Sequence, residues 1–310
     1  MKHINQFITE YIIKKKLDKP IDSEYKYHPQ TKEELVKNIK ELLYEEETDL
    51  NCINTSNITD MSNLFRILNV STNINVSKWN VSNVTNMYNM FYNCQDFNCD
   101  LSNWDVSKVI NMTNMFYDCK KFEGKGLENW DVSKVNNMEC MFIGCKNFNC
   151  NLYNWDVSNV KYMNYTFGRC DNFEFKGLEN WNVSNVKYMA GMFVKCENFT
   201  GKVLENWDVS KVEGMSEIFS GCSKFDCDLS KWNVSNVKDM FSMFDGCKNF
   251  EGKGLENWDV SNVVDMSRMF YECNKFNCDL SKWNVKKVKY TNVMFTNCNS
   301  LKKLPTWYKK

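Results

Sequence analysis

The chain of 310 residues carries no net charge, because 39 Lys and Arg residues balance 39 Asp and Glu residues, and 43% of it is hydrophobic. This composition is typical of a globular protein. It excludes an intrinsically disordered chain and a protein that overall charge directs to nucleic acid. The unusual features are 10 Trp, 15 Cys and 17 Met against only 3 Pro.

Residues 1–30 are predicted to form an amphipathic helix followed by a linker. Apolar residues recur at helical spacing in the first part, and Pro20 and Pro29 lie in the second. The helix is expected to extend the cap of the fold, or alternatively to dock a partner or a membrane surface. Polar residues interrupt its apolar stripe, so no signal peptide is predicted, and the sequence has no apolar run of membrane-spanning length.

Residues 31–50 are predicted to hold a capping helix. Thr31 and Glu34 form a capping-box pattern at its start. Apolar residues follow at helical spacing: Leu35, Ile39, Leu42 and Leu43. Because a turn of a repeat protein cannot bury its own apolar face, this helix is expected to cover the first turn of the region that follows.

Residues 51–300 contain a repeat of 25 or 26 residues. A phrase such as NWDVSKVINM, which begins at Asn103, recurs with small changes and sets nine tryptophans 25 or 26 residues apart. A cysteine follows each of these tryptophans fifteen residues later. The length varies only between Cys and the next Trp, where a short form (FNCDLSNW) or a long form (FEGKGLENW) occurs. Length variation confined to one segment indicates a surface loop.

Each repeat shows two periodicities. Trp104 and Val106 alternate with a polar residue, as in a strand, and Val109 to Cys119 places apolar residues at offsets 0, 3, 6, 7 and 10, as in a short helix. One strand and one helix in 25–26 residues fall within the range of leucine-rich repeats. The predicted fold is an α/β solenoid of about ten turns, with a parallel β-sheet on one side, short helices on the other and a helical N-terminal cap.

Residues 301–310 are predicted to cap the other end. This segment keeps Leu304 and Trp307 of the repeat but places Pro305 between them. A proline has no backbone N–H to donate to a further strand, so the sheet is expected to stop there.

The repeat resembles the BspA-type repeat, a leucine-rich-repeat-like unit of bacterial surface proteins and mycoplasma lipoproteins that also occurs in phages and giant viruses. The resemblance rests on the pattern WDVSNVTNMxxMFxxCxxFNxDLSxWDVS, which covers Asn51 to Trp307, and on the flanking TKEELVKNIKELL. It implies a solenoid that serves adhesion or interaction, with no catalytic residues common to the family. The secretion signal or lipoprotein cysteine of surface members is missing here, which favours an intracellular or viral setting.

Two columns of equivalent residues are predicted to form the core. The large tryptophan rings are expected to be buried, and the cysteines to be buried and free. Central members of this predicted core ladder are Trp104, Trp130, Trp155, Trp181, Cys119, Cys145, Cys170 and Cys196. Stacked turns would bring thiols within disulfide range, so metal or redox use of the cysteines is the alternative, although a straight column does not supply tetrahedral zinc.

No catalytic, cofactor-binding or metal-binding residues are predicted. The only histidines, His3 and His28, precede the repeats, and no nucleophile elbow or phosphate-binding glycine motif occurs. An outward Asp or Asn follows each repeat tryptophan, as at Asp105 and Asp131. This column is expected to form a solvated polar face rather than a calcium site.

Aromatic residues break the repeat pattern in one region. Tyr162 and Tyr188 occupy, in neighbouring turns, a position that is usually Asn, Gly or Asp. Tyr165 stands beside Thr166, which replaces a core methionine, and Phe175 replaces a repeat glycine. Aromatic residues gathered on adjacent turns are typical of a partner-binding surface. Local repacking, with Tyr165 filling space beside Thr166, is the alternative interpretation.

The predicted function is a non-enzymatic scaffold for protein–protein interaction, located in the cytoplasm or associated with a virion. Its partner is predicted to be another protein rather than nucleic acid, with no transmembrane segment, no cofactor and a monomeric state favoured. Two alternatives stay open: a surface adhesin of the BspA type, and a metal- or redox-active cysteine ladder.

Overall fold

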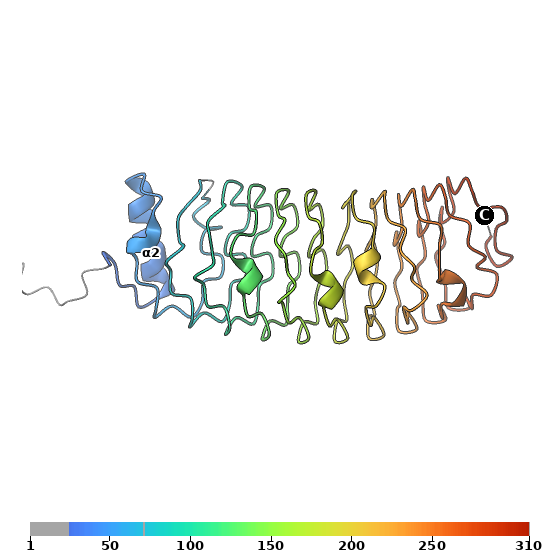
Figure 1. The fold of residues 1–310 in the computed structure, drawn as a ribbon, viewed down its shortest axis with the longest axis horizontal. Coiled ribbons are helices and arrows are strands. Elements are labelled where there is room, and N and C mark those ends of the chain that lie inside the picture. The colour runs from blue at the N-terminus through green and yellow to red at the C-terminus, as the bar shows by residue number, and fades with distance from the viewer. Residues whose placement is uncertain (1–24, 71, 310) are drawn as a thin grey trace, which may run out of the picture.

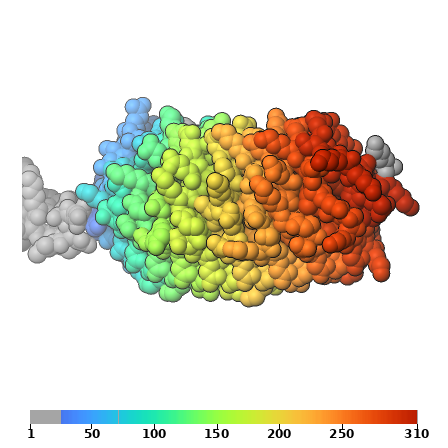
Figure 2. All heavy atoms as spheres, turned by 45° about the vertical axis from the view of Figure 1, so that its right-hand side comes forward, coloured from blue at the N-terminus to red at the C-terminus, as the bar shows by residue number. Residues whose placement is uncertain are grey.

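The computed structural model describes residues 25–70 and 72–309, which form a rod of stacked turns (Figure 1). The colours succeed one another along the rod in both views (Figures 1 and 2), so each turn lies between its predecessor and its successor in the sequence. The amphipathic helix predicted within residues 1–30 falls on residues outside the described part. In the described part, the chain is a solenoid whose turns contact mainly their neighbours.

Parallel backbone bridges join neighbouring turns at one position per turn. These positions, here called the bridge column, are Asp60, Asn86, Asn111, Asn137, Tyr162, Tyr188, Gly214, Asp239, Asp265 and Tyr290. Beside the bridges, alternate backbone N–H groups donate to carbonyl groups of the next turn, as from Met112 to Asn137 at 3.0 Å and from Asn114 to Glu139 at 2.9 Å. The near-constant repeat length keeps these donors and acceptors in register.

The helix predicted from Val109 to Cys119 is wrong. This stretch contains the bridge residue Asn111 and a run of turns. Its N–H groups donate three residues back, as from Met115 to Met112 at 3.1 Å, or to the next turn. Asn114 has a φ of 54°, which interrupts a right-handed helix. Apolar residues three and four apart therefore arise from successive tight turns that mimic the helical period.

The strand predicted at Trp104 and Val106 is also wrong, because these residues belong to no strand and lie between two turns, and the described residues pair through isolated bridges elsewhere. The Trp104 N–H donates to the Leu101 carbonyl at 3.0 Å, and the Val109 N–H donates to the Val106 carbonyl at 2.8 Å. Trp104 and Val106 are nevertheless both buried, as their alternation with a polar residue indicates.

Short 3₁₀-helices are the regular structure within the long form of the loop. Those in the long loops are η2 (Leu127–Asn129), η3 (Leu178–Asn180), η4 (Lys202–Leu204) and η5 (Leu255–Asn257). A further 3₁₀-helix, η1 (Leu50–Cys52), lies near the N-terminal cap. A glycine in the left-handed region precedes each of η2 to η5, such as Gly126 with a φ of 92°. The 3₁₀ turn takes up the extra residue, so the following Trp keeps its place in the stack.

Helix α2 (Lys32–Tyr44) lies at the N-terminal end of the solenoid, as Figure 1 shows. The Glu34 N–H donates to the Thr31 side chain at 3.2 Å, which is the N-cap that the sequence predicts. The Lys32 ammonium donates to Asp60 at 3.0 Å and thereby ties the helix to the first bridge residue. The buried residues of the helix are Leu35, Ile39 and Leu42.

The tryptophans line the core of the solenoid, and every indole N–H is used. The Nε1–H of Trp155 donates to the Leu127 carbonyl of the preceding turn at 2.7 Å, and its ring lies 6.2 Å from that of Trp181 at an interplanar angle of 2°. The same indole bond is made by Trp79, Trp104, Trp130, Trp181, Trp207, Trp232, Trp258, Trp283 and Trp307. Tryptophan combines a large apolar ring with a donor that reaches this carbonyl, which explains its recurrence.

The segment 301–309 continues the core stacks at the C-terminal end. The Trp307 indole donates to the Leu280 carbonyl at 2.8 Å, and the Tyr308 ring meets Phe295 edge-on at 5.0 Å. Pro305 is buried beside them. These residues cover part of the last turn and extend the core to the end of the rod.

Candidate functional site

Tyr162 and Tyr188 lie on adjacent turns of the bridge column and form an exposed aromatic stack. Their backbones are bridged directly, and their ring centroids are 5.7 Å apart with an interplanar angle of 8°. The two residues are 38% and 37% exposed. Equivalent side chains on paired backbones lie side by side, so the ladder itself sets the stacking. We call these two residues the tyrosine pair.

Tyr165 lies three residues after Tyr162 but packs against the solenoid. Its φ is 55°, and its ring covers Gly191 of the next turn so closely that an added Cβ there would overlap the ring. The neighbouring Thr166 is fully buried and donates its hydroxyl to the Met163 carbonyl at 2.8 Å. The structure therefore places the Tyr165 ring over Gly191 of the next turn.

Phe175 is only 5% exposed and belongs to the phenylalanine stacks of the core. Its ring centroid lies 4.6 Å from that of Phe173 and 4.3 Å from that of Phe199. It is not brought together with the tyrosine pair. Of the four residues predicted for the partner surface, only Tyr162 and Tyr188 have rings that are stacked together and substantially exposed.

Charged side chains flank the tyrosine pair on one side. Lys161 and Lys187 immediately precede the two tyrosines and are exposed, and neither makes an ion pair within the described part of the chain. One and two turns further on, the same position holds Glu213 and Lys238, which form an ion pair of 2.6 Å. Two exposed ammonium groups therefore lie beside the pair, followed by the Glu213 carboxylate on the next turn.

Gly214, the next member of the bridge column after Tyr188, was not among the residues predicted for the partner surface. The backbones of the two residues are bridged. Gly214 has no side chain to set against the Tyr188 ring, and a Cβ added to it would lie 3.3 Å from ring atom Cδ1. The signal was present in the repeat, since Gly214 stands at the same offset from Phe219 as Tyr188 does from Phe193.

The cysteine column forms a hydrogen-bonded ladder in the core. The Cys170 thiol donates to the Phe142 carbonyl of the preceding turn at 3.1 Å, and the Cys196 thiol donates to the Phe167 carbonyl at 3.1 Å. The same bond is made by Cys119, Cys145, Cys222, Cys247, Cys273 and Cys298. A small, weakly polar donor fits this buried position, and all cysteines of the described part are free thiols.

Burial suppresses ionisation of these thiols. It raises the pKa of Cys94 and Cys196 to about 12, from an ordinary value of 9.0. The thiolate is the form that binds metals and attacks disulfides, so a protonated thiol is poorly suited to either role. The column therefore supports packing better than metal or redox chemistry.

The free energy of unfolding is expected to decrease steeply at alkaline pH. The buried thiols stay protonated in the folded chain up to about pH 12 but ionise near 9 when the chain unfolds. Their contribution is complete below pH 9 and is lost as the pH rises toward 12, by about 1.4 kcal/mol per pH unit for each thiol. Urea midpoints measured between about pH 8 and about pH 10 should show this fall. Cys196→Ala should have a shallower slope, and an unchanged slope would contradict the assignment.

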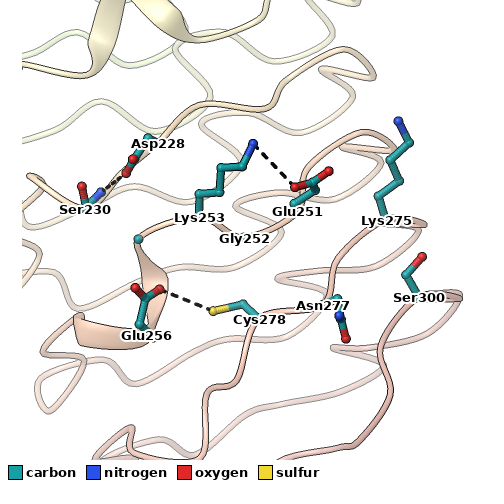
Figure 3. A pocket seen from close by; sticks show the side chains of 11 residues that line it. Asp228, Ser230, Glu251, Gly252, Lys253, Glu256, Lys275, Asn277, Cys278 and Ser300 are labelled. Carbon is teal, nitrogen blue, oxygen red and sulfur yellow. Dashed lines mark hydrogen bonds and ion pairs between the residues drawn. The ribbon is translucent and has the colours of Figure 1, made fainter.

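A polar hollow lies on the loop side of the solenoid, where a long turn precedes a short one (Figure 3). Several of its polar groups are already partnered: Lys253 lies 3.5 Å from Glu251, and the Cys278 thiol lies 3.8 Å from Glu256. Burial raises the pKa of Cys278 to about 12, and the Glu256 carboxylate adds to the shift. A similar hollow beside Cys150 follows another long turn, so the repeat lengths produce it.

The outward Asp and Asn column has a local structural role. The Ser107 N–H donates to the Asp105 carboxylate at 3.0 Å, and hydrogen bonds from Ser107 hold the pKa of Asp105 below its usual value. Ser133 and Asp131 form the same turn. Such Asx turns explain the recurrence of these residues. Among the described residues, no group of three or more His, Cys, Asp or Glu side chains is arranged to hold a metal ion.

These features define a leucine-rich-repeat-like solenoid, with a stacked hydrophobic core and one exposed aromatic pair on its bridge column. The chain belongs to the family described as Mycoplasma protein of unknown function, DUF285, whose profile matches residues 33–127, 120–204 and 198–307. The match confirms the resemblance to bacterial and mycoplasma surface-protein repeats. No curated protein matches the sequence significantly.

Two solved structures show remote similarity. A leucine-rich repeat protein from Bacteroides ovatus is 15% identical, with 79% of this chain and 81% of that chain covered and a TM-score of 0.22. The TLR13–ssRNA13 complex is 12% identical, with 87% of this chain and 48% of that chain covered and a TM-score of 0.24. Within the described residues, no helix has the length and apolar character needed to cross a membrane.

Proposed function

We propose that this protein is a non-enzymatic interaction scaffold that binds another protein through the tyrosine pair. The observation that carries the proposal is the stacking of Tyr162 on Tyr188, at 5.7 Å, while both rings stay more than one third exposed. Tyrosine is enriched among the residues that dominate binding energy at interfaces. Because the ladder already orders the two rings, binding them costs little conformational entropy.

A rigid solenoid suits such a role. Its hydrogen-bonded core columns hold the turns at fixed spacing and leave their outer surface free for a partner. The free cysteines fit a reducing compartment, so we place the protein in the cytoplasm or in association with a virion. A monomer is sufficient for this function.

The tyrosine pair is tested by a pull-down from native host extract. Tyr162→Ala/Tyr188→Ala should lower recovery of the specific partner at least about tenfold, because two interface tyrosines each contribute on the order of 1–2 kcal/mol. Tyr290→Ala is the matched control, since Tyr290 occupies the same column and is 52% exposed. Tyr165 is kept unchanged because its ring covers Gly191.

Equal recovery by the double variant and the wild type would refute the tyrosine pair as the binding site. Equal loss with Tyr290→Ala would show that the effect is not local. Circular dichroism and urea unfolding of all three proteins should coincide, because the substituted rings lie outside the core. Recovery only from the cell exterior, with oxidised thiols, would favour the surface adhesin instead.

A further inference from the structure

We propose that the C-terminal end of the solenoid binds an acidic segment of a partner protein, which adds to the last turn as one turn adds to another. This surface, here called the C-terminal edge, is formed by residues 290–308 at the end marked C in Figure 1. On the bridge column, Tyr290 lies four turns beyond Tyr188 of the tyrosine pair. The inference therefore concerns a second surface and goes beyond the proposed function.

The last turn of the ladder has backbone donors without acceptors. In the turn before it, the N–H groups of Arg268, Phe270 and Glu272 donate to carbonyl groups of the last turn at 2.9 to 3.0 Å. Four equivalent N–H groups of the last turn have no acceptor among the described residues, namely those of Thr291, Val293, Phe295 and Asn297. Such a row of unpaired donors is a template on which another chain can pair.

The same turn leaves part of the core uncovered. Val263 and Cys273 are fully buried, whereas their equivalents in the last turn, Val288 and Cys298, are partly exposed. A hollow of about 540 Å³ lies beside the unpaired donors, and its apolar lining consists of Val293, Phe295, Leu301, Leu304 and Tyr308. Apolar side chains of an incoming segment would be removed from water in this hollow.

Val293 presents an apolar side chain to this hollow despite an unfavourable backbone conformation. Its φ is 48°, and it is the only β-branched residue with a positive φ in the described part of the chain. Such a residue adopts this region at an energetic cost. The equivalent position in other turns holds residues that tolerate a positive φ better, such as Asn89 and Asn114. Val293 is nevertheless 46% exposed, and contact with a partner would explain why an apolar residue stands there.

The charges favour an acidic segment. Residues 280–310 contain eight Lys and no Asp or Glu, although the whole chain is neutral. Lys302 and Lys303 are exposed, make no ion pair within the described part, and line a second hollow that shares two leucines with the first. Asp279 is the only acidic residue among the described residues that line either hollow, and it already accepts the Ser281 N–H at 2.9 Å. Carboxylates of an incoming segment would therefore meet a basic surface.

Other occupants fit the C-terminal edge less well. A second copy joined through the same end would oppose two basic surfaces. A second copy joined through its N-terminal end would present helix α2, whose carbonyl groups accept hydrogen bonds within the helix and at its cap. Nucleic acid would match the lysines but not the aliphatic lining of the hollow around Val293.

The repeat itself supplies a test peptide. Residues 213–221 (EGMSEIFSG) are acidic, and their carbonyl groups at alternate positions accept N–H groups of the turn before. The Gly191 N–H, for example, donates to the Ser216 carbonyl at 2.8 Å, and Val293 is the equivalent of Gly191 in the last turn. The peptide acetyl-EGMSEIFSG-amide therefore combines carbonyl acceptors, apolar side chains and carboxylates in the order that the C-terminal edge requires.

Binding is measured by amide hydrogen exchange of the ¹⁵N-labelled full chain, followed by NMR with and without the peptide. The amides of Val293, Phe295 and Asn297 should exchange at least about tenfold more slowly with the peptide, because they gain acceptors. Two control peptides should each bind at least about tenfold more weakly: one with Lys in place of both Glu residues, and one with Ser in place of Met, Ile and Phe.

Val293→Asn is the decisive variant. Asn tolerates a positive φ and stands at the equivalent position in Asn89 and Asn114, so the variant should be at least as stable as the wild type. It should nevertheless bind the peptide about fivefold more weakly, because the apolar contact is lost. Ile110→Asn is the matched control, since Ile110 is 45% exposed in a middle turn and Asn136 is its equivalent in the next turn. It should leave binding unchanged.

Lys302→Glu/Lys303→Glu tests the charge. Both side chains are exposed, so the variant should fold normally. It should bind the peptide at least about tenfold more weakly and lose most of the salt dependence of binding.

Unchanged binding to Val293→Asn or to the lysine variant, or equal binding of the three peptides, would overturn this inference. Protection of residues 291–297 that appears on raising the protein concentration without peptide would overturn it in favour of a second copy. Tighter binding of oligo-dT than of the peptide would overturn it in favour of nucleic acid. Failure of the peptide to bind would remove this inference alone, whereas failure of the tyrosine pair in the pull-down would remove only the proposed site there.

Discussion

Replacing Trp155 with Phe is expected to lower the free energy of unfolding by about 2–4 kcal/mol. The substitution removes the indole hydrogen bond to the Leu127 carbonyl, which is 2.7 Å long and buried, and leaves a void where the pyrrole part of the ring was. It also breaks the stack with Trp181. Urea unfolding followed by far-ultraviolet circular dichroism measures the loss.

The matched control is Trp307→Phe. Trp307 makes the same bond to Leu280 at 2.8 Å, but it lies at the C-terminal end of the rod and is partly exposed. Its replacement should cost about 1 kcal/mol. Because turns stabilise one another through their neighbours, the Trp155 variant should also broaden the transition by weakening the ladder in its middle. Equal losses for the two variants would refute the role of the buried indole bond.

Gly126→Ala is expected to destabilise the solenoid by at least about 3 kcal/mol. Gly126 has a φ of 92°, which side-chain-bearing residues rarely adopt, and a Cβ added there would overlap the Ser102 backbone of the preceding turn. Backbone atoms cannot rotate out of the way as a flexible side chain can. The turns would have to separate locally, which weakens the contacts between them.

Gly246→Ala separates the two causes. Gly246 also has a positive φ, 73°, but an added Cβ would find its nearest neighbour 3.6 Å away, at Gly221. Only the backbone strain is introduced there, so a loss of about 1 kcal/mol is expected. Thermal unfolding of the two variants side by side tests the difference. Losses of similar size would show that the approach of Gly126 to Ser102 is not limiting.

The spacing of a few residues was enough to predict the solenoid. Equal distances from Trp155 to Cys170 and from Trp181 to Cys196 require equivalent backbone paths in successive turns. Turns with equivalent backbone paths stack so that equivalent residues lie above one another. The buried tryptophan and cysteine columns therefore follow from the sequence. The position of Tyr162 beside Tyr188 follows in the same way, because both stand five residues before a core phenylalanine.

Secondary structure within a turn could not be predicted from the same residues. Apolar residues from Val109 to Cys119 satisfy a helical period, but tight turns with residues such as Asn114 in the left-handed region satisfy it equally. The acceptors of the backbone N–H groups determine whether the segment forms a helix or a series of tight turns. In this solenoid, alternate groups donate to the next turn, as Met112 does to Asn137, and are then unavailable for a helix.

For the candidate surface too, the sequence predicts some features and only the folded structure decides the others. The repeat pattern alone identifies Tyr162, Tyr188 and the deviating Phe175, since each breaks the pattern at a known offset. Only the packing of one turn on the next decides that Phe175 is buried among phenylalanines and that Tyr165 covers Gly191. The period of a repeat determines which residues form a column. The exposure of each residue also depends on the volumes of the side chains in adjacent turns, and these come together only in the folded structure.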